Sequence, residues 1–379
     1  MKITDLKTFT VHAGGSNWVF AKVYTDEGLT GLGEGHVATK DAATAAAILE
    51  HRRFLVGKDP FEIERLWQAM YRYPRWRGGP VLNSAISAIE IALWDILGKA
   101  LNVPVYQLLG GACRDRVRLY AHVGGRTPSE IAAHGQALVE AGFNAMKTGP
   151  VWANEDGVVP MPPDLKAEAR RIGALREAVG DRVDIMVDAH GRLPLHVAAE
   201  FARRIEEFDV MFLEEATDPE DIDALEWLGA RTRIPLATGE RLFTKWAFTE
   251  IVERHLVSYL QPDIVHAGGI LEMKKIAAMA ESRFIQVAPH NPQSWVSTMA
   301  SLHLDACTPS CVIQEFVFPG PDFQRDLFIG GPVVKDGYAE LPGGRGLGID
   351  LNEEVAARHP YVPVHRPHWV WEDGSVADW

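Results

Sequence analysis

Six polar residues of the kinds that enzymes use in catalysis each follow a short apolar run in the second half of the chain. They are Asp188, Glu214, Glu240, Asp263, His290 and Glu315. Their spacing of roughly 25 residues matches one strand, one helix and two short loops. A single carboxylate at a strand end often only caps a helix or pairs with a surface lysine. Six of them at the period of a fold need one common cause, and they indicate a ring of functional groups around one cavity.

Three of these residues, Asp188, Glu214 and Glu240, have the chemistry of a site for a hard cation. Carboxylates without a suitably placed cysteine favour Mg²⁺ over zinc and leave coordination positions for water or substrate. A cation would also relieve the repulsion between converging carboxylates. It could hold both oxygens of a substrate carboxylate and neutralise the enediolate that forms when the neighbouring carbon loses a proton.

Two histidines have positions that suit proton transfer. His290 and Asp263 end adjacent expected strands, and a carboxylate bound to an imidazole fixes its tautomer and raises its basicity. His190 lies two residues after Asp188, so in an extended strand the two side chains point the same way. The chain has 14 histidines, and those in the C-terminal tail, with Trp369 and Trp371, are interpreted as packing residues.

The elements that must position these residues repeat as units of strand and helix. The apolar runs before the six residues predict strands at 183–187, 210–213, 234–238, 257–260, 284–288 and 311–313. Two earlier strands are expected at 117–123 and 143–148, the second with Lys147 at its end. This pattern is typical of an α/β barrel, whose active site lies at the carboxyl ends of the strands. The Pro-rich and Gly-rich stretch 149–163 predicts a long loop over the barrel mouth.

The N-terminal part of the chain predicts a separate α+β module. Segments 19–25 and 29–34 alternate in polarity around Asp26-Glu27-Gly28, which is typical of an antiparallel hairpin. Helical spacing of apolar residues predicts helices at 42–55, 61–71 and 82–100. We therefore expect three parts: a module at 1–115, a barrel at 116–328, and a C-terminal segment at 329–379 that packs back on the first module.

Bulk composition favours an enzyme with a small-molecule partner. A formal net charge of −13 argues against nucleic acid and anionic membranes as partners. Cys113, Cys307 and Cys311 show neither metal-ligand spacing nor a disulfide framework, which favours a reduced cytoplasmic compartment. The first residues lack the apolar core of a signal peptide. We expect no segment with the ~20 apolar residues that span a bilayer.

The sequences around the candidate residues form a recognisable set. They include Asp188-Ala189-His190-Gly191-Arg192, Leu213-Glu214-Glu215, Gly239-Glu240-Arg241, Gln261-Pro262-Asp263, His266-Ala267-Gly268-Gly269 and Ala288-Pro289-His290. This set resembles the active-site motifs of the enolase superfamily, mandelate racemase subgroup, and within it the acid-sugar dehydratases. The resemblance extends over essentially the whole chain, including its ending, 372–379.

The resemblance implies a modified (β/α)₇β barrel under a capping domain built from both chain ends. It implies that the three carboxylates bind Mg²⁺ and that His290 with Asp263 is the base. It also implies that His190 is the acid for a leaving hydroxyl and that Glu315 hydrogen-bonds the enediolate. A small acid sugar as substrate and a homo-oligomeric assembly are further implications.

Two departures from the subgroup pattern bear on the reaction. Racemases of the subgroup carry Lys-x-Lys on the second strand, whereas Lys147-Thr148-Gly149 keeps only the first lysine. Racemisation needs a base on each face of the carbon, so this loss favours dehydration. Ala216 stands where many relatives have proline after Glu-Glu, and it changes the wall of the site.

Substrate contacts are expected from capping loops at 12–18 and 71–79 and from the first two barrel strands. The candidates are Asn17, Arg75, Trp76, Arg77, His122 and Lys147. For each loop residue the alternative is packing between the domains.

The sequence therefore predicts a Mg²⁺-dependent dehydratase of a sugar acid, such as galactonate, gluconate or mannonate, that yields a 2-keto-3-deoxy acid. An epimerase or racemase of a hydroxy acid would use the same enediolate, with His190 as a second base. A third alternative is a sugar-acid-binding regulatory protein of low activity.

Overall fold

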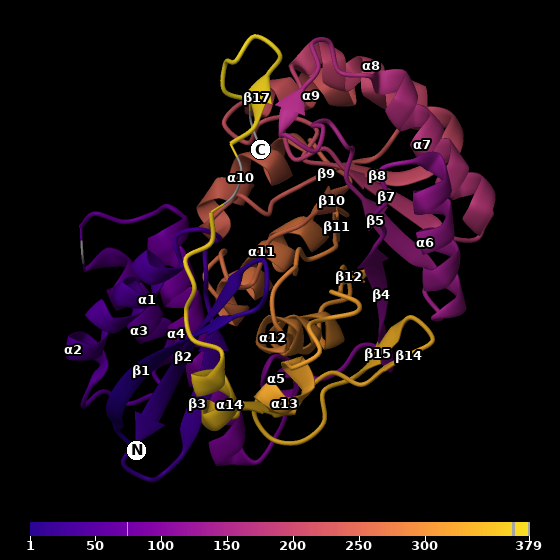
Figure 1. Ribbon diagram of the computed structural model, residues 1–379. Helices are drawn as coiled ribbons and strands as arrows, with labels where there is room; N and C mark the ends of the chain where they lie inside the picture. Colours follow the sequence, from indigo (N-terminus) through magenta and orange to yellow (C-terminus); the bar gives the residue numbers. More distant parts are fainter. Residues whose placement is uncertain (74, 366–367, 378–379) are drawn as a thin grey trace.

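The computed structural model describes residues 1–73, 75–365 and 368–377, in which an N-terminal module lies beside a larger barrel (Figure 1). The module contains an antiparallel sheet in the order β1-β2-β3. Its strands are β1 (Ile3–His12), β2 (Asn17–Thr25) and β3 (Thr30–Glu34). Its helices are α1 (Asp41–Glu50), α2 (Arg52–Leu55), α3 (Ile63–Arg72), α4 (Pro80–Leu101) and α5 (Val105–Leu108).

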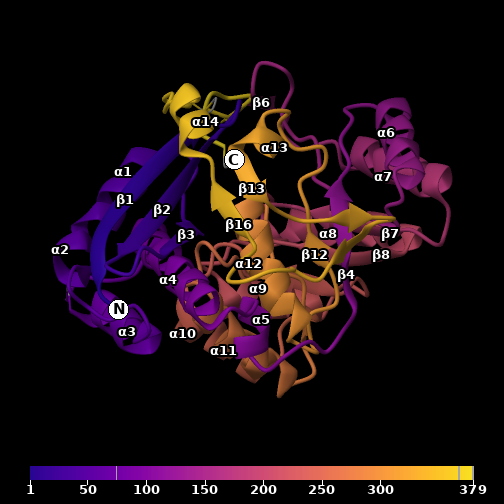
Figure 2. The ribbon, with the colours of Figure 1, turned by 90° about the horizontal axis from the view of Figure 1, so that it is seen from below.

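Glycines on β3 let the sheet approach α4 closely. A Cβ atom built at Gly31 would lie 1.9 Å from the carbonyl oxygen of Ala92, and one at Gly33 would lie 1.9 Å from that of Ala88. Ala88 and Ala92 lie one helical turn apart on the same face of α4. Gly31 and Gly33 are two residues apart and lie on the same face of β3, so each glycine packs against one of these alanines. Seen from below, α4 lies between this sheet and the barrel (Figure 2), and it contacts α11 of the barrel.

The expectation that no segment is apolar enough to span a bilayer was wrong for α4. By length and composition this helix of 22 residues passes that test, with a mean hydropathy of 1.4. However, 83% of its apolar window is buried inside the protein, as expected for the central helix of a core.

The barrel has eight strands joined by seven helices. Its strands are β4 (Arg116–His122), β5 (Ala145–Thr148), β7 (Asp184–Asp188), β8 (Val210–Glu214), β9 (Leu236–Thr238), β10 (Tyr259–Leu260), β11 (Gln286–Val287) and β12 (Gln314–Glu315). Its helices are α6 (Pro128–Glu140), α7 (Leu165–Val179), α8 (Leu195–Ile205), α9 (Ile222–Gly229), α10 (Thr244–Arg254), α11 (Ile270–Glu281) and α12 (Trp295–Ala306). This succession is (β/α)₇β, as the resemblance implied.

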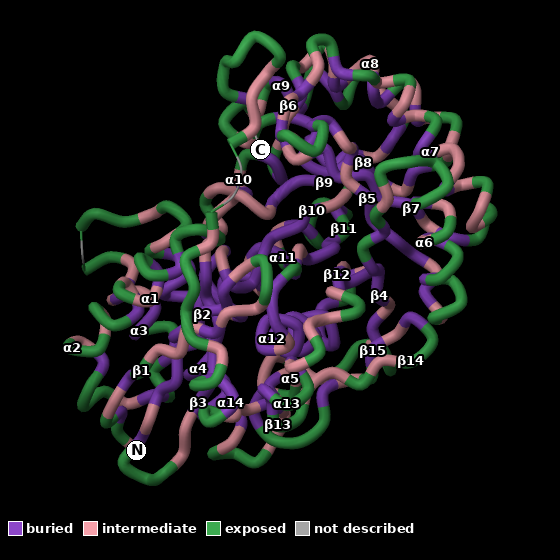
Figure 3. The backbone as a smooth tube through the Cα atoms, in the orientation of Figure 1, coloured by how far each residue is buried: buried purple, intermediate pink, exposed green. Residues whose placement is uncertain are grey.

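Parallel pairing carries the sheet around to its first strand. The order runs from β4 through β5, β7, β8, β9 and β10 to β11. Cys311 bridges Val287 of β11, and β12 pairs with β4. Inside, one layer of buried side chains fills the barrel: Tyr120, Ala145, Met186, Phe212, Ala237, Ala288 and Ile313. Figure 3 shows these strands as a buried centre inside more exposed helices. On β4, β5, β7 and β8, the residue two positions after the one in this buried layer is polar.

Several expected boundaries were wrong in detail. Phe284, the expected start of a strand, is 94% exposed with φ 57°, and β11 begins two residues later. The run 311–313 supplies one bridge only, and β12 follows it. The expected helix at 42–55 is divided at His51 into α1 and α2. β1 was not predicted.

The C-terminal segment packs on both parts of the molecule. β13 (Phe328–Gly330) pairs with β16 (Ile349–Leu351), and α14 (Glu353–Arg358), which follows α13 (Gln324–Leu327) in the chain, packs against β1. The hairpin of β14 (Val334–Lys335) and β15 (Tyr338–Glu340) extends the barrel sheet at β4. Beyond it, the chain runs to β17 (Val370–Trp371), which pairs with β6 (Val158–Val159) in the long loop (Figure 1). Packing on the N-terminal module is therefore only part of what this segment does. The three-part division of the chain stays a prediction.

Candidate active site

The three predicted metal ligands converge at the carboxyl ends of neighbouring strands. Asp188 and Glu214 are the last residues of β7 and β8, and these two residues are directly paired in the sheet. Glu240 lies two residues beyond β9, after Gly239, whose φ of 143° is one that side-chain-bearing residues rarely adopt. One carboxylate oxygen from each residue lies within 4.8 Å of the other two. The sequence prediction that these three residues come together is consistent with this geometry.

Lys147 occupies the centre of this charge cluster. Its Nζ lies 2.7 Å from Glu214 Oε1, 3.0 Å from Glu315 Oε1 and 3.9 Å from Asp188 Oδ2. The lysine side chain is only 5% exposed. Burial would lower the pKa of Lys147, but the carboxylates outweigh it and hold the pKa well above its usual value. Lys147 is therefore a fixed cation beside the three carboxylates.

The three carboxylates repel one another, and a bound divalent cation would relieve that repulsion. Burial raises the pKa of Glu214 well above its usual value, and Asp188 and Glu240 raise it further. Lys147 pairs with one oxygen of Glu214, while the other, Oε2, is buried without a hydrogen-bond partner among the residues described. A buried charged oxygen without a partner is costly, and an oxygen-liganded cation such as Mg²⁺ would satisfy it.

A histidine and a carboxylate form a close pair at one end of the triad. His290 Nδ1 lies 2.7 Å from Asp263 Oδ2, which also accepts a hydrogen bond from Gln293 Nε2 at 2.8 Å. The backbone N–H of Val265 donates to the other oxygen of Asp263 at 2.8 Å. With Nδ1 held by Asp263, Nε2 of His290 faces the triad, 3.1 Å from Glu240 Oε2.

Electrostatics make His290 a strong base. Burial would lower its pKa, but Glu240, Glu315 and Asp263 outweigh burial and raise the pKa of His290 to about 10. A cation shared with Glu240 would reduce the contribution of that carboxylate and bring the pKa down toward neutral pH. Occupation of the metal site and basicity of His290 are therefore linked.

His190 lies at the opposite end of the triad. Its Nε2 is 3.0 Å from Asp188 Oδ2, and its backbone N–H donates to Asp188 Oδ1 at 2.9 Å. The residue has φ 55°, in the left-handed region that is uncommon for a side-chain-bearing residue and that marks functional sites. Its side chain is 34% exposed, against 14% for His290. The two histidines thus flank the carboxylates from opposite ends, with different surroundings.

Glu315 and His122 complete the ring from β12 and β4. His122 Nε2 hydrogen-bonds Glu315 Oε1, and the backbone N–H of Asn291 donates to Glu315 Oε2 at 2.7 Å. Burial would raise the pKa of Glu315, but Lys147 outweighs it and holds the pKa well below its usual value. Glu315 is therefore a fixed anion at the ring. His122, at 47% side-chain exposure, is open to solvent.

The structure does not place the four capping-loop candidates in the ring of functional groups. Arg75 lies over the aromatic ring of Trp76, 5.7 Å from its centroid. Asn17 is fully buried, and its Nδ2 donates to Asp41 Oδ2 at 3.1 Å and to the carbonyl oxygen of Val362 at 3.0 Å. Trp76 is 80% exposed, and Arg77 lies over the ring of Tyr71 at 5.2 Å. Asn17 thus ties the C-terminal tail to the N-terminal module. A role in substrate contact stays a prediction for all four.

Sequence reasoning missed other polar groups near the ring. Gln261, in the motif next to Asp263, is fully buried, and both its amide atoms lack partners within the described parts of the chain. His266 lies 3.8 Å from Asp263 Oδ2, and its Nδ1 shares a hydrogen bond of 2.8 Å with Ser84 on α4. Its ring faces His36 of the N-terminal module at 6.4 Å. The only sequence signal for Gln261 and His266 was their place in the quoted motifs.

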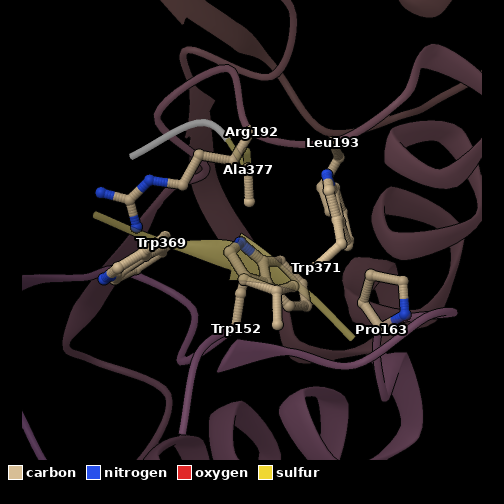
Figure 4. Close-up of a pocket in the computed structure, with 8 residues that line it drawn as sticks. Trp152, Pro163, Arg192, Leu193, Trp369, Trp371 and Ala377 are labelled. Atoms are coloured by element: carbon tan, nitrogen blue, oxygen red, sulfur yellow. The ribbon is translucent and has the colours of Figure 1, made fainter. Parts of the chain in front are cut away.

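Three tryptophans from distant segments meet beside the loop that carries His190. Trp152 comes from the loop after β5, whereas Trp369 and Trp371 come from the C-terminal tail. We call these three residues the aromatic clasp. Figure 4 shows them around Arg192 and Leu193, which follow His190 in the chain. The space that they enclose is about 10 Å³, near the minimum for one water molecule, so the clasp is a packed contact and not a ligand pocket.

Fold and site together define a class of enzyme: a (β/α)₇β barrel with a capping module, three carboxylates at the ends of successive strands, and a His-Asp pair beside them. Comparison with known families agrees. Residues 130–355 match the enolase C-terminal domain-like family, and residues 5–110 match the mandelate racemase / muconate lactonizing enzyme N-terminal domain. The chain belongs to the mandelate racemase / muconate lactonizing enzyme group of the enolase superfamily, which confirms the resemblance.

Individual relatives cover the chain from end to end. D-galactonate dehydratase from Ralstonia pickettii is 39% identical over 100% of both chains. A crystal structure of an enolase from Pantoea ananatis with bound D-gluconate and Mg has a TM-score of 0.90 at 33% identity, covering 99% of each chain. The 3,6-anhydro-D-galactonate cycloisomerase from Zobellia galactanivorans has a TM-score of 0.87 at 29% identity, over 96% of this chain and 100% of the other.

Proposed function

We propose that this protein is a Mg²⁺-dependent dehydratase that removes water from a sugar acid to give a 2-keto-3-deoxy acid. The observation that carries the proposal is the pair of histidines at opposite ends of one carboxylate triad. His290 contacts Glu240 at one end and His190 contacts Asp188 at the other. Removal of a proton and loss of a hydroxyl need a base and an acid around one bound carboxylate, and this arrangement supplies both.

Asp188, Glu214 and Glu240 would hold the cation. When bound, Mg²⁺ supplies a fixed positive charge that binds the substrate carboxylate and neutralises the charge gained on loss of the alpha proton. Lys147 would contact the same substrate carboxylate and add a second fixed positive charge, while the anionic Glu315 holds the Lys147 ammonium and the His122 imidazole in place. Lys147 already bridges Glu214 and Glu315, at 2.7 and 3.0 Å.

His290 takes the alpha proton onto Nε2. The hydrogen bond from Nδ1 to Asp263 leaves Nε2 with the lone pair and stabilises the imidazolium that forms. The electron pair of the broken C–H bond moves into the enediolate. His190 then gives a proton to the beta hydroxyl, which leaves as water while the electron pair forms the C2–C3 double bond. The resulting enol becomes the 2-keto acid.

Gly149 supports dehydration over racemisation. It stands where a racemase of this subgroup would place its second lysine, and a Cβ atom built there would lie 3.3 Å from Cε1 of His190. A longer side chain at position 149 would therefore compete with His190 for the same space. In this proposal His190, acting as an acid, lies beside the position at which the racemase pattern has its second basic lysine.

Two relatives support a sugar acid as the substrate class. One, 39% identical, is named D-galactonate dehydratase, and the other, 33% identical, is an enolase with bound D-gluconate and Mg. The cycloisomerase shows that the same fold also carries another reaction, so the fold alone does not select dehydration. From the resemblance we also expect a cytoplasmic homo-oligomer.

The alternative is an epimerase that uses the same enediolate, with His190 as a second base. Its proximity to Asp188 would allow that role as well. A non-catalytic sugar-acid sensor is less favoured, since mere binding does not need both histidines beside the triad.

A screen of a sugar-acid library with Mg²⁺ tests the proposal, with 2-keto acid formation as the readout. Acids that differ only at C2 are then supplied separately and followed by NMR. We expect one epimer to lose water and the other to remain unchanged, because one base reaches one face of the carbon. Interconversion of the epimers without loss of water would replace the dehydratase with the epimerase. Acids that bind without any turnover would favour the sensor.

A further inference from the structure

We propose that the aromatic clasp is a positioning device for His190, so that the C-terminal tail sets the rate of hydroxyl loss without touching the substrate. This inference rests on the proposed function, in which His190 is the acid. The clasp residues come from segments far apart in sequence: Trp152 from the loop after β5, and Trp369 and Trp371 from the tail, where Trp371 belongs to β17.

His190 is held from two sides by loops, not by a strand. The loop after β5 begins with Gly149, whose virtual Cβ lies 3.3 Å from Cε1 of His190. On the other side, Gly191 follows with φ 66°, and its N–H donates to the carbonyl oxygen of Glu215 at 2.5 Å. Both bracketing residues are glycines, so neither contributes side-chain packing that would hold the imidazole in place. Asp188 contacts both Nε2 and the backbone N–H of His190, and any further support must come from outside these two glycines.

The tail forms a hairpin beside these loops. Residues 369–377 fold back on themselves: the N–H of Ala377 donates to the carbonyl oxygen of Trp369 at 2.9 Å, and that of Gly374 donates to Trp371 at 2.8 Å. Val370 and Val376 form an antiparallel bridge. The expected motif 372–379 lies in this hairpin, except for its last two residues, which are outside the described part of the chain.

The hairpin is attached to the first of the two loops by backbone pairing. β17 pairs in parallel with β6, and the N–H of Val370 donates to the carbonyl oxygen of Gly157 at 3.0 Å. Glu372 accepts a hydrogen bond from the N–H of Met161 at 3.2 Å. Trp152 of the same loop is 4% exposed and packs edge-on against Phe201 of α8 at 5.3 Å. This loop thus contacts both the tail and the helix that follows the His190 turn.

The second loop is attached through Arg192 and Leu193. The guanidinium of Arg192 lies over the ring of Trp369, 4.6 Å from its centroid, which is the geometry of a cation–π contact. Leu193 is 6% exposed and lines the same cluster (Figure 4). Arg192 is two residues from His190, so a shift of Arg192 moves the turn that fixes the imidazole. Misplacement of a reacting group by about 1 Å can cost about 100-fold in rate.

The other half of the site does not depend on the clasp. His290 is held by Asp263, which receives hydrogen bonds from Gln293 and Val265 at 2.8 Å, all within the barrel. A defect in the clasp should therefore slow hydroxyl loss while leaving proton abstraction intact. A general loss of folding would instead slow both.

The test measures two rates on the same variant: exchange of the alpha proton in D₂O and formation of the 2-keto acid. We expect Trp369→Leu to lower keto acid formation about 10-fold or more, with unchanged exchange and unchanged melting of the barrel. Trp369→Phe keeps an aromatic ring under Arg192 and should restore much of the rate. Trp227→Leu is the matched control. Trp227, on α9 and outside the clasp, also has an arginine over its ring, with the guanidinium of Arg231 3.8 Å from the ring centroid.

Each other outcome overturns the inference. Equal loss of exchange and keto acid formation in Trp369→Leu would make the clasp a folding element only. Loss of the same size in Trp227→Leu would make the effect nonspecific. Unchanged rates in Trp369→Leu would leave the tail without a role in catalysis. Failure of the proposed function is distinguishable, because the wild-type protein would then form no 2-keto acid from any sugar acid, whether or not it exchanges the alpha proton.

Discussion

The two ends of the carboxylate triad are built in different ways. The His290 end is formed by residues that follow neighbouring strands, and its carboxylate partner Asp263 is fully buried and held by two further hydrogen bonds. The His190 end is formed by a left-handed turn between two glycines, and its side chain is more than twice as exposed. One histidine is positioned by the barrel and the other by loops.

The roles proposed for the two histidines would account for this difference. A base that removes a weakly acidic proton benefits from a fixed tautomer and a fixed orientation, which a buried carboxylate provides. An acid that protonates the beta hydroxyl must match the configuration of the carbon that carries it, and a loop allows its position to change between relatives. The barrel end therefore supports the chemistry common to the fold, and the loop end supports the particular reaction.

The largest effect is expected at Glu214, which lies between the two ends. In Glu214→Gln the amide replaces a carboxylate that pairs with Lys147 at 2.7 Å and offers its other oxygen to the cation. We expect loss of both exchange and dehydration, and weaker Mg²⁺ binding by calorimetry, with the fold retained because the group faces the mouth. Normal activity in this variant would show that the metal assignment is wrong.

His290→Asn should abolish removal of the alpha proton and, with it, the later loss of the hydroxyl. Without the imidazole there is no base for the alpha proton, so both deuterium exchange and 2-keto acid formation should fall by at least about 100-fold. Mg²⁺ binding should persist, since the three ligands remain. Exchange that survives in this variant would transfer the base role elsewhere, with Lys147 the first residue to test.

His190→Asn should separate the two steps. The base at the barrel end is untouched, so exchange of the alpha proton continues, while protonation of the leaving hydroxyl is lost and keto acid formation falls by about 100-fold or more. NMR in D₂O measures both in one sample. If exchange disappeared together with dehydration, His190 would take part in proton abstraction, which is the epimerase arrangement.

The sequence predicts the barrel end of the site better than the loop end. The triad, Asp263, His290 and Glu315 were predictable because each follows an apolar run whose period identifies the barrel, and parallel strands end at one edge. The acid role of His190 came from resemblance, since a residue beyond a strand end can point in many directions. Contacts of Trp152, Arg192 and Trp369 could not be predicted, because irregular segments have no periodicity that relates them.

The fold shows the same limit. Repeated strand and helix units predicted an α/β barrel, the resemblance implied the order (β/α)₇β, and the structure has that order. The short strands near the end of the barrel were misplaced, because two ladder residues in β11 or β12 are fewer than the apolar runs around them. In such runs, apolar residues that pack behind the strand look the same in sequence as those within it.

A smaller effect is expected from Gly149→Ala, which tests the loop end directly. The added methyl would lie 3.3 Å from Cε1 of His190 and 3.5 Å from the carbonyl oxygen of Asp188, so the imidazole must shift by a few tenths of an ångström. We expect keto acid formation to fall by about 3- to 10-fold, with exchange unchanged. Gly124→Ala is the control, since its nearest contact there would be 4.0 Å away. Equal effects in both variants would contradict a specific contact with His190.

The smallest effect is expected in the pH dependence of stability, and it should come from the barrel end. The carboxylates around His290 raise its pKa to about 10 in the folded protein, above its ordinary value of 6.5. Between these two values the folded state holds a proton that the unfolded state has lost. The stabilisation is therefore complete below pH 6.5 and is lost as pH rises toward about 10.

In metal-free protein this loss should amount to roughly 1–3 kcal/mol, since burial and the shared carboxylates limit it. Denaturant unfolding across the range measures it. His290→Asn should flatten the curve, whereas His190→Asn should keep it. Saturating Mg²⁺ should also flatten it, because Glu240, the first of the carboxylates that raise the pKa of His290, then shares its charge with the cation. A slope that disappears in His190→Asn and survives in His290→Asn would show that His290 is not the histidine responsible for the pH dependence.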